Sequence, residues 1–146
     1  MIRRNFLKNI SAGALILLTP FSLMAGWIEG AFTTTDMKEA LNLVGASDLE
    51  ESDLITLKTP EIAENGAIVP VTVSTDLPNV TSISLFVEKN PTPLTSQFDI
   101  TKDMLPSISL RIRMGATSQV MAVVISDGKA YKTTKEVKVT IGGCGG

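Results

Sequence analysis

The stretch Val120-Met121-Ala122-Val123-Val124-Ile125-Ser126-Asp127-Gly128-Lys129-Ala130-Tyr131 decides the fold. Its first six residues are all apolar, which is typical of a strand that is covered on both faces and lies in the centre of a sheet. Asp127-Gly128 is a sequence that favours a two-residue hairpin turn. We therefore predict a central strand that turns back at these two residues into a second strand beginning with Lys129 to Tyr131.

Apolar residues alternate with polar ones along most of the chain from Leu54 onward, and a period of two predicts strands. The other predicted strands contain Ile55 to Leu57, Val69 to Val73, Ile83 to Val87, Ile108 to Met114 and Val137 to Ile141. Asn65-Gly66 is expected to be a turn, and Asn90 to Pro93 a loop. Pro70 indicates an edge strand, because proline has no N–H to donate to a neighbour.

One short helix is predicted before these strands, from about Asp36 to Val44. Asp36 and Glu39 have the spacing of a capping box, and Gly45 stands where a helix would end. The acidic stretch Asp48 to Asp53 is expected to be a loop. The apolar positions of this helix have the spacing of one buried face: Met37, Ala40, Leu41 and Val44.

About seven strands after one helix predict an all-β protein, an immunoglobulin-like antiparallel β-sandwich with a short N-terminal helix. Arg111 and Arg113 are expected to point outward between inward-facing apolar residues. Met114 and Met121 are interpreted as core residues rather than metal ligands. The Cys and Trp spacing of antibody domains is absent, so the prediction concerns architecture alone.

Residues 1–26 have the form of an export signal. Arg3, Arg4 and Lys8 precede the apolar segment Ile10 to Met24, and small residues follow at Ala25-Gly26. The Arg pair is similar to a twin-arginine signal, and a retained membrane anchor is the alternative. We therefore expect an export signal (1–26), a β-sandwich domain with its helix (27–141) and a flexible C-terminal arm (142–146).

The composition excludes several classes of function. The 146 residues include no histidine and one cysteine, so histidine-based zinc sites, Cys-His pairs and Ser-His-Asp triads are unavailable within the chain. We expect no metal, no cofactor and no internal disulfide. Beyond Lys8 the chain has 10 basic and 15 acidic residues, a net charge of −5, which disfavours nucleic acid. The spaced run Lys129, Lys132, Lys135 and Lys138 is interpreted as a solvated strand face.

The unusual chemistry is at the C-terminus, which reads Gly142-Gly143-Cys144-Gly145-Gly146. Glycine is a poor choice for ordered structure, since ordering it costs the most conformational entropy. A glycine arm is thin, and three extended residues can carry the sulfur ~10 Å beyond the last strand. No Lys, Arg or His lies in the arm to favour the nucleophilic thiolate. We predict that the chain presents the thiol and that another protein activates it; the alternative is a functionless tail.

The terminal Gly-Gly-Cys-Gly-Gly resembles the signature of the SoxY family, the substrate carriers of bacterial thiosulfate oxidation. The resemblance extends over the chain, from the leader to the strand that precedes the arm. The segments that carry it are Pro60 to Gly66, Val69-Pro70-Val71, Asn90 to Pro93, Arg111 to Met114 and Val137 to Ile141.

This resemblance implies a periplasmic, non-catalytic carrier. It implies that a haem c enzyme joins Cys144 to thiosulfate, that a hydrolase releases sulfate, and that a sulfur dehydrogenase can oxidise the remaining sulfur. It also implies a SoxZ-like β-sandwich subunit as partner, exported together with the folded chain. Gly142, Gly143, Gly145 and Gly146 would give the arm its flexibility.

Two alternatives stay open at this point. A secreted structural sandwich could use Cys144 to form a disulfide-linked dimer. A thiocarboxylate sulfur carrier also ends in Gly-Gly, but it works in the cytosol on a β-grasp fold and needs no cysteine.

Overall fold

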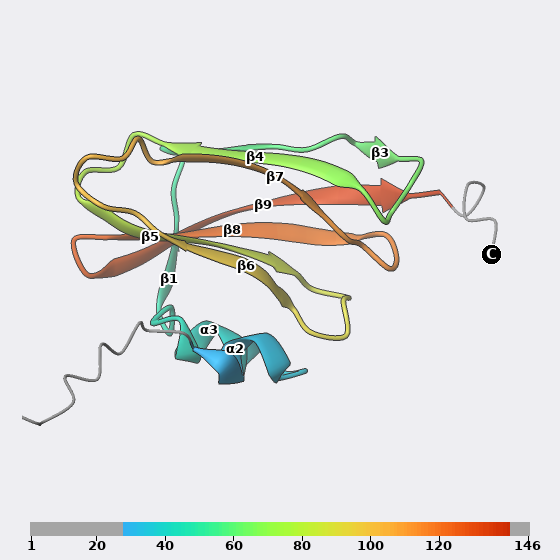
Figure 1. Cartoon of the computed structure of the whole chain (residues 1–146), viewed down its shortest axis with the longest axis horizontal. Coiled ribbons are helices and arrows are strands. Elements are labelled where there is room, and N and C mark those ends of the chain that lie inside the picture. Colours follow the sequence, from blue (N-terminus) through green and yellow to red (C-terminus); the bar gives the residue numbers. More distant parts are fainter. Residues whose placement is uncertain (1–27, 141–146) are drawn as a thin grey trace, which may run out of the picture.

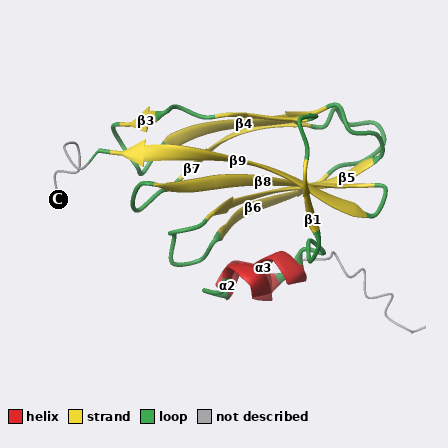
Figure 2. Cartoon of the chain, turned by 180° about the vertical axis from the view of Figure 1, so that it is seen from behind, coloured by secondary structure: helices red, strands yellow, loops and turns green. Residues whose placement is uncertain are grey.

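The computed structural model describes residues 28–140, which form two β-sheets packed face to face with helices against the outer face of the larger sheet (Figure 1). The larger sheet has the strand order β1-β9-β8-β5-β6, with β3 beside the end of β9; the smaller has the order β2-β4-β7. Figure 2 shows the same layers from behind. The predicted all-β sandwich is confirmed.

The bounds of the elements are α2 (Glu29–Thr33), α3 (Met37–Leu43), β1 (Leu49–Glu51), β2 (Ile55–Lys58), β3 (Ile62–Ala63), β4 (Val69–Thr75), β5 (Val80–Val87), β6 (Leu94–Asp99), β7 (Ser107–Ile112), β8 (Ser118–Ser126) and β9 (Lys129–Val139). Strand pairs are antiparallel, except that β1 and β3 each run parallel to β9. Residues 1–27 and 141–146 lie outside the described part, so the predicted export signal and arm are not tested by it.

Strand β8 is central, as predicted, because it pairs with β9 on one side and β5 on the other. Val120, Ala122 and Val124 face the inner core, while Val123 packs against the helices. Asp127 and Gly128 both have positive φ, 49° and 75°, and connect β8 to β9 in a two-residue turn. The segments predicted as two strands after this turn form one continuous strand, β9; Ile141 lies outside the described residues.

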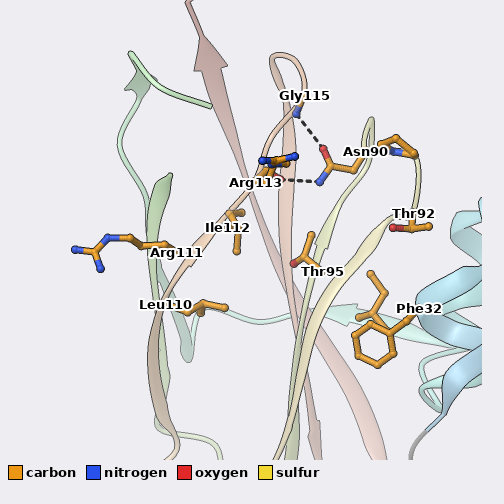
Figure 3. A pocket seen from close by; sticks show the side chains of 11 residues that line it. Phe32, Asn90, Thr92, Thr95, Leu110, Arg111, Ile112, Arg113 and Gly115 are labelled. Atoms are coloured by element: carbon orange, nitrogen blue, oxygen red, sulfur yellow. Dashed lines mark hydrogen bonds between the residues drawn. The ribbon is translucent and has the colours of Figure 1, made fainter. Parts of the chain in front are cut away.

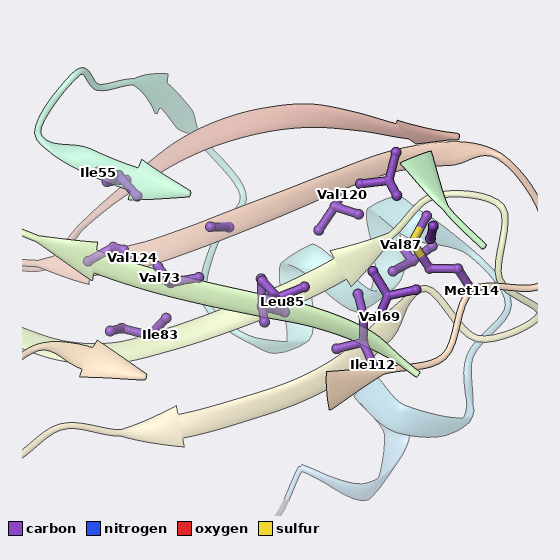
Figure 4. Packing of buried hydrophobic residues seen from close by; sticks show 14 of the residues in the cluster. Ile55, Val69, Val73, Ile83, Leu85, Val87, Ile112, Met114, Val120 and Val124 are labelled. Carbon is purple, nitrogen blue, oxygen red and sulfur yellow. The ribbon is translucent and has the colours of Figure 1, made fainter. Parts of the chain in front are cut away.

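The inner core lies between the two sheets and is built from the alternating apolar residues of β4, β5 and β8 (Figure 4). Val73, Ile83 and Leu85 have no exposed surface. Met114 is 2% exposed and belongs to this core, as predicted. Arg111 and Arg113 are exposed on either side of buried Ile112, which confirms the expected alternation.

A second apolar cluster joins the helices to the outer face of the larger sheet. Ala31 and Ala40 pack with Phe86 and Val123, and the partly buried Met121 packs against the same cluster. Helix α3 begins as predicted, because the Asp36 carboxylate accepts a hydrogen bond of 2.8 Å from the Glu39 N–H. The prediction of one helix was wrong, since α2 precedes it; five residues are too few to display a helical period.

Three strands were not predicted. The acidic stretch expected to be a loop contains β1, whose Glu51 pairs with Lys132 at 3.3 Å. The sequence Leu94-Thr95-Ser96-Gln97 of β6 is too polar to show alternation, and the two residues of β3 are too few. These strands depend on tertiary pairing rather than on local pattern.

The prediction that Pro70 lies in an edge strand was wrong, although Pro70 itself has a strand neighbour on one side only. Its strand, β4, is the middle strand of the smaller sheet. However, β2 pairs only with Thr72 to Thr75, while Pro70 pairs with Arg111 of β7. One side of β4 is therefore without a strand neighbour at Pro70, and the missing N–H is tolerated there.

The lysine run of β9 does not share one face. A spacing of three alternates between the faces of a strand, so Lys129 and Lys135 lie opposite to Lys132 and Lys138. Lys132 is half-buried and paired with Glu51. No helix within residues 28–140 is long and apolar enough to cross a membrane.

Leu85→Ala should lower the free energy of unfolding by about 2–5 kcal/mol, because it leaves a cavity in the middle of the inner core. The matched control is Leu105→Ala, whose side chain is 84% exposed and should matter little. Urea denaturation monitored by far-ultraviolet circular dichroism measures the free energy of unfolding of both variants. Equal stabilities for the two variants would contradict this account of the core.

Candidate functional site: the root of the C-terminal arm

Cys144, Gly142, Gly143, Gly145 and Gly146 lie outside the described residues, so the structure defines the root from which the arm starts. Strand β9 runs to one end of the sandwich and the described chain ends just beyond it, at Thr140 (Figure 1). Cys144 is four residues further along the chain. Four extended residues span about 13 to 14 Å, so the sulfur can operate within that radius of the root.

The root of the arm, residues 138–140, donates hydrogen bonds from its backbone on both of its edges. On one edge, the N–H groups of Lys138 and Thr140 donate to the carbonyl oxygens of Glu61 and Ala63, at 2.9 and 3.1 Å. On the other edge, the Val139 N–H donates to the Thr117 hydroxyl at 2.9 Å. The root is therefore paired residue by residue up to Thr140.

The Thr117 side chain takes the place of a strand neighbour for Val139. Strand β8 begins at Ser118, which pairs with Val137, so no β8 residue remains to pair with Val139. The Thr117 hydroxyl accepts the N–H that would otherwise have no partner on that edge. Sequence reasoning missed Thr117, since a threonine in a loop has no distinguishing local signal.

Gly66 packs closely against the same root. The Met114 N–H donates to the Gly66 carbonyl at 2.7 Å. A Cβ on Gly66 would lie 2.4 Å from the Met114 carbonyl oxygen and 3.0 Å from the Val139 side chain. The expected Asn65-Gly66 turn is confirmed, and the close approach to Met114 is what requires glycine at position 66.

A groove of about 590 Å³ opens between β6 and β7 (Figure 3). At one end of it Asn90 joins two loops: its amide donates to the Arg113 carbonyl at 2.7 Å, and its oxygen accepts from the Gly115 N–H at 3.2 Å. The loop of Asn90 to Pro93 was predicted, but the groove was not. Within residues 28–140, no group of three or more acidic or other ligating side chains could hold a metal.

The family model of the sulfur oxidation protein SoxY matches residues 40–144 of this chain, a segment that ends on Cys144. The chain belongs to the SoxY family. This membership confirms the family resemblance noted in the sequence and supports a sulfur-carrier role. The match takes in both the sandwich and the cysteine of the arm.

Solved structures agree with this assignment. The chain is 46% identical to the sulfur carrier protein SoxY from Chlorobium limicola f thiosulfatophilum, with a TM-score of 0.65, covering 71% of this chain and 96% of that one. A superoxide reductase (neelaredoxin) from Ignicoccus hospitalis is 15% identical with a TM-score of 0.56, covering 63% of this chain and 94% of that one; this likeness shows the fold alone. A comparison with curated proteins finds no match.

Thr117→Val should free the Val139 N–H and loosen the root, since valine keeps the shape of threonine without the acceptor oxygen. We expect the Val139 amide to exchange with solvent about tenfold faster, the effect of losing one hydrogen bond. Thr117→Ser keeps the hydroxyl and is the matched control. Hydrogen exchange followed by NMR measures each amide; unchanged exchange in Thr117→Val would show that the root does not depend on this bond.

Proposed function

We propose that the chain is a covalent carrier that holds thiosulfate-derived sulfur on Cys144 and presents it to partner enzymes. The observation that carries the proposal is the family match, which extends over the sandwich and ends on the single cysteine of the chain. The root described above supports it, because a paired and packed root gives the arm a fixed starting point.

The chemistry proposed at Cys144 is an oxidative conjugation followed by hydrolysis. The thiol sulfur forms a bond to the sulfane sulfur of thiosulfate; the thiol proton and two electrons leave, and a haem c enzyme accepts the electrons. Water then cleaves the bond to the sulfonate group, which releases sulfate and a proton and leaves a persulfide on Cys144. A hydrolase performs this second step, and a sulfur dehydrogenase oxidises the persulfide where one is present.

The chain itself is proposed to be non-catalytic. Its sequence has no histidine, and no side chain of residues 142–146 can accept a proton from the thiol. Gly142, Gly143, Gly145 and Gly146 are proposed to let the cysteine enter a partner's active site. The enzymes that receive it supply the redox centre and the activated water.

We further propose that the carrier acts in the periplasm with a SoxZ-like subunit. The support for export is the leader-like segment of residues 1–26 with its Arg3-Arg4 pair. Folded export through the twin-arginine route would allow a leaderless partner to cross with the chain. The thiocarboxylate alternative is disfavoured by the fold, since a β-sandwich is not a β-grasp.

The test is intact mass spectrometry of the protein from thiosulfate-grown cells, with and without reductant. We expect reductant-removable sulfur and sulfonate adducts that are absent in Cys144→Ser. The matched control is Cys144→Ser combined with Thr134→Cys, which removes the thiol of the arm and places one at an exposed position of strand β9. This relocated thiol should stay unloaded, because it cannot reach a buried active site.

Two outcomes would contradict the proposal. One is a thiol that stays unmodified during active thiosulfate oxidation, and the other is a symmetric disulfide dimer as the sole modified species. Either would favour the structural alternative.

A further inference from the structure

The two open sides of the sandwich differ in how their sheet edges are protected. On one side the edge strands are short: β1 has three residues, two of them glutamates, β3 has two residues, and β2 has four and ends in Lys58. On the other side the edge strands β6 and β7 have six residues each. Strand β6 contains no Lys, Arg or Pro, and Asp99 at its end is its one charge. Proteins commonly shield free edges with such residues, so β6 stands out as an unshielded edge.

The register shows which backbone groups of β6 are free. The Ile100 N–H donates to the Thr81 carbonyl at 2.9 Å, and hydrogen-bonded pairs alternate along an antiparallel ladder. Phe98 opposite Ile83 is therefore bonded to β5, whereas the N–H and C=O groups of Gln97 and Asp99 point away from it. Strand β6 is the last strand of its sheet within residues 28–140, so no strand there pairs with these groups.

Two side chains of β6 also lack a neighbour: Phe98 is incompletely buried, and the Ser96 hydroxyl lacks a hydrogen-bond partner within residues 28–140. Phe98 is 37% exposed although it lies on the inward-facing side of β6. The Ser96 hydroxyl is buried and has no hydrogen-bond partner among residues 28–140. The groove between β6 and β7 runs alongside, with Leu94 and Leu110 in its lining (Figure 3).

Charge favours an acidic occupant. Arg113 lies at the Asn90 end of the groove, while Arg111 points away from it (Figure 3). The ion pair formed within residues 28–140 joins Lys132 to Glu51, so Arg113 has no carboxylate partner there. An acidic side chain brought to this end of the groove would meet an unpaired guanidinium group.

We propose that β6 is extended by a β-strand of a second protein, which covers the groove and places an acidic side chain against Arg113. A row of free N–H and C=O groups is matched by an extended strand and by little else. We assign this strand to the SoxZ-like subunit, and this assignment is the part of the inference that rests on the proposed function. Gly115 and Thr117 belong to one loop, which connects the Arg113 end of the groove to the root, so this partner would lie beside the arm.

The first test removes one edge N–H. Gln97→Pro deletes an outward-facing donor without touching a bond to β5, whereas Gln97→Ala keeps the donor and loses the side chain. The full mature chain is co-purified with its SoxZ-family subunit, and dissociation is followed by sedimentation velocity over a dilution series. We expect about tenfold weaker association for Gln97→Pro and an unchanged value for Gln97→Ala.

The second test uses charge and does not depend on the backbone. Arg113→Glu should weaken association by about tenfold or more, and Lys58→Glu, an equal reversal on the opposite edge, should not. In the unmodified complex, hydrogen exchange should slow at the Gln97 and Asp99 amides when the subunit binds. Circular dichroism of each variant shows whether it is folded.

The outcomes separate this inference from the proposed function. Unchanged exchange at Gln97 and Asp99 in the complex, or full association of folded Gln97→Pro, would overturn the strand assignment while leaving sulfur loading on Cys144 intact. Self-association of the chain that Gln97→Pro abolishes would assign the edge to a second copy and overturn the SoxZ-like partner. Loss of Cys144 adducts with this interface confirmed would instead reject the proposed function.

Discussion

The pairing of β9 is the interaction on which the rest of the structure depends. This strand pairs with β8 from Lys129 to Val137, with β1 near its start and with β3 at its end. Its apolar residues Tyr131 and Val137 pack into the inner core, while Ala130 packs under the helices. Because one strand joins both cores and then continues into the arm, the stability of the sandwich is transmitted directly to the root of Cys144.

Much of the fold could be predicted because its signals are local. Alternation in β4 and β5, the apolar run of β8 and the Asp127-Gly128 turn each specify structure over a few neighbouring residues. Strands β1 and β6 could not be predicted, since β1 is acidic and β6 is polar. Each is formed by pairing with another strand, β9 for β1 and β5 for β6, and not by a local pattern. The same limit explains Pro70, whose tolerance depends on how far β2 extends and not on anything adjacent to the proline.

The candidate site divides in the same way. Cys144 could be selected from the sequence by elimination, since it is the single cysteine of a chain without histidine and stands among glycines. The contacts that hold its root could not be selected, because Thr117 and Val139 are 22 residues apart and the strands β4 to β7 lie between Gly66 and Met114. A hydroxyl that completes a strand edge has no pattern in one sequence.

The short arm also bears on where a partner must be held. Ordering five glycine-rich residues costs on the order of 5 to 10 kcal/mol, so the arm itself contributes little net binding energy when it enters an active site. The energy of association must then come from contacts with the body of the carrier. The active site that receives Cys144 must at the same time lie within about 13 to 14 Å of Thr140, the reach of four extended residues. A sandwich with one shielded side and one unshielded side suits this requirement, because a stable subunit can occupy the free edge of β6 while the arm stays available to enzymes that bind briefly.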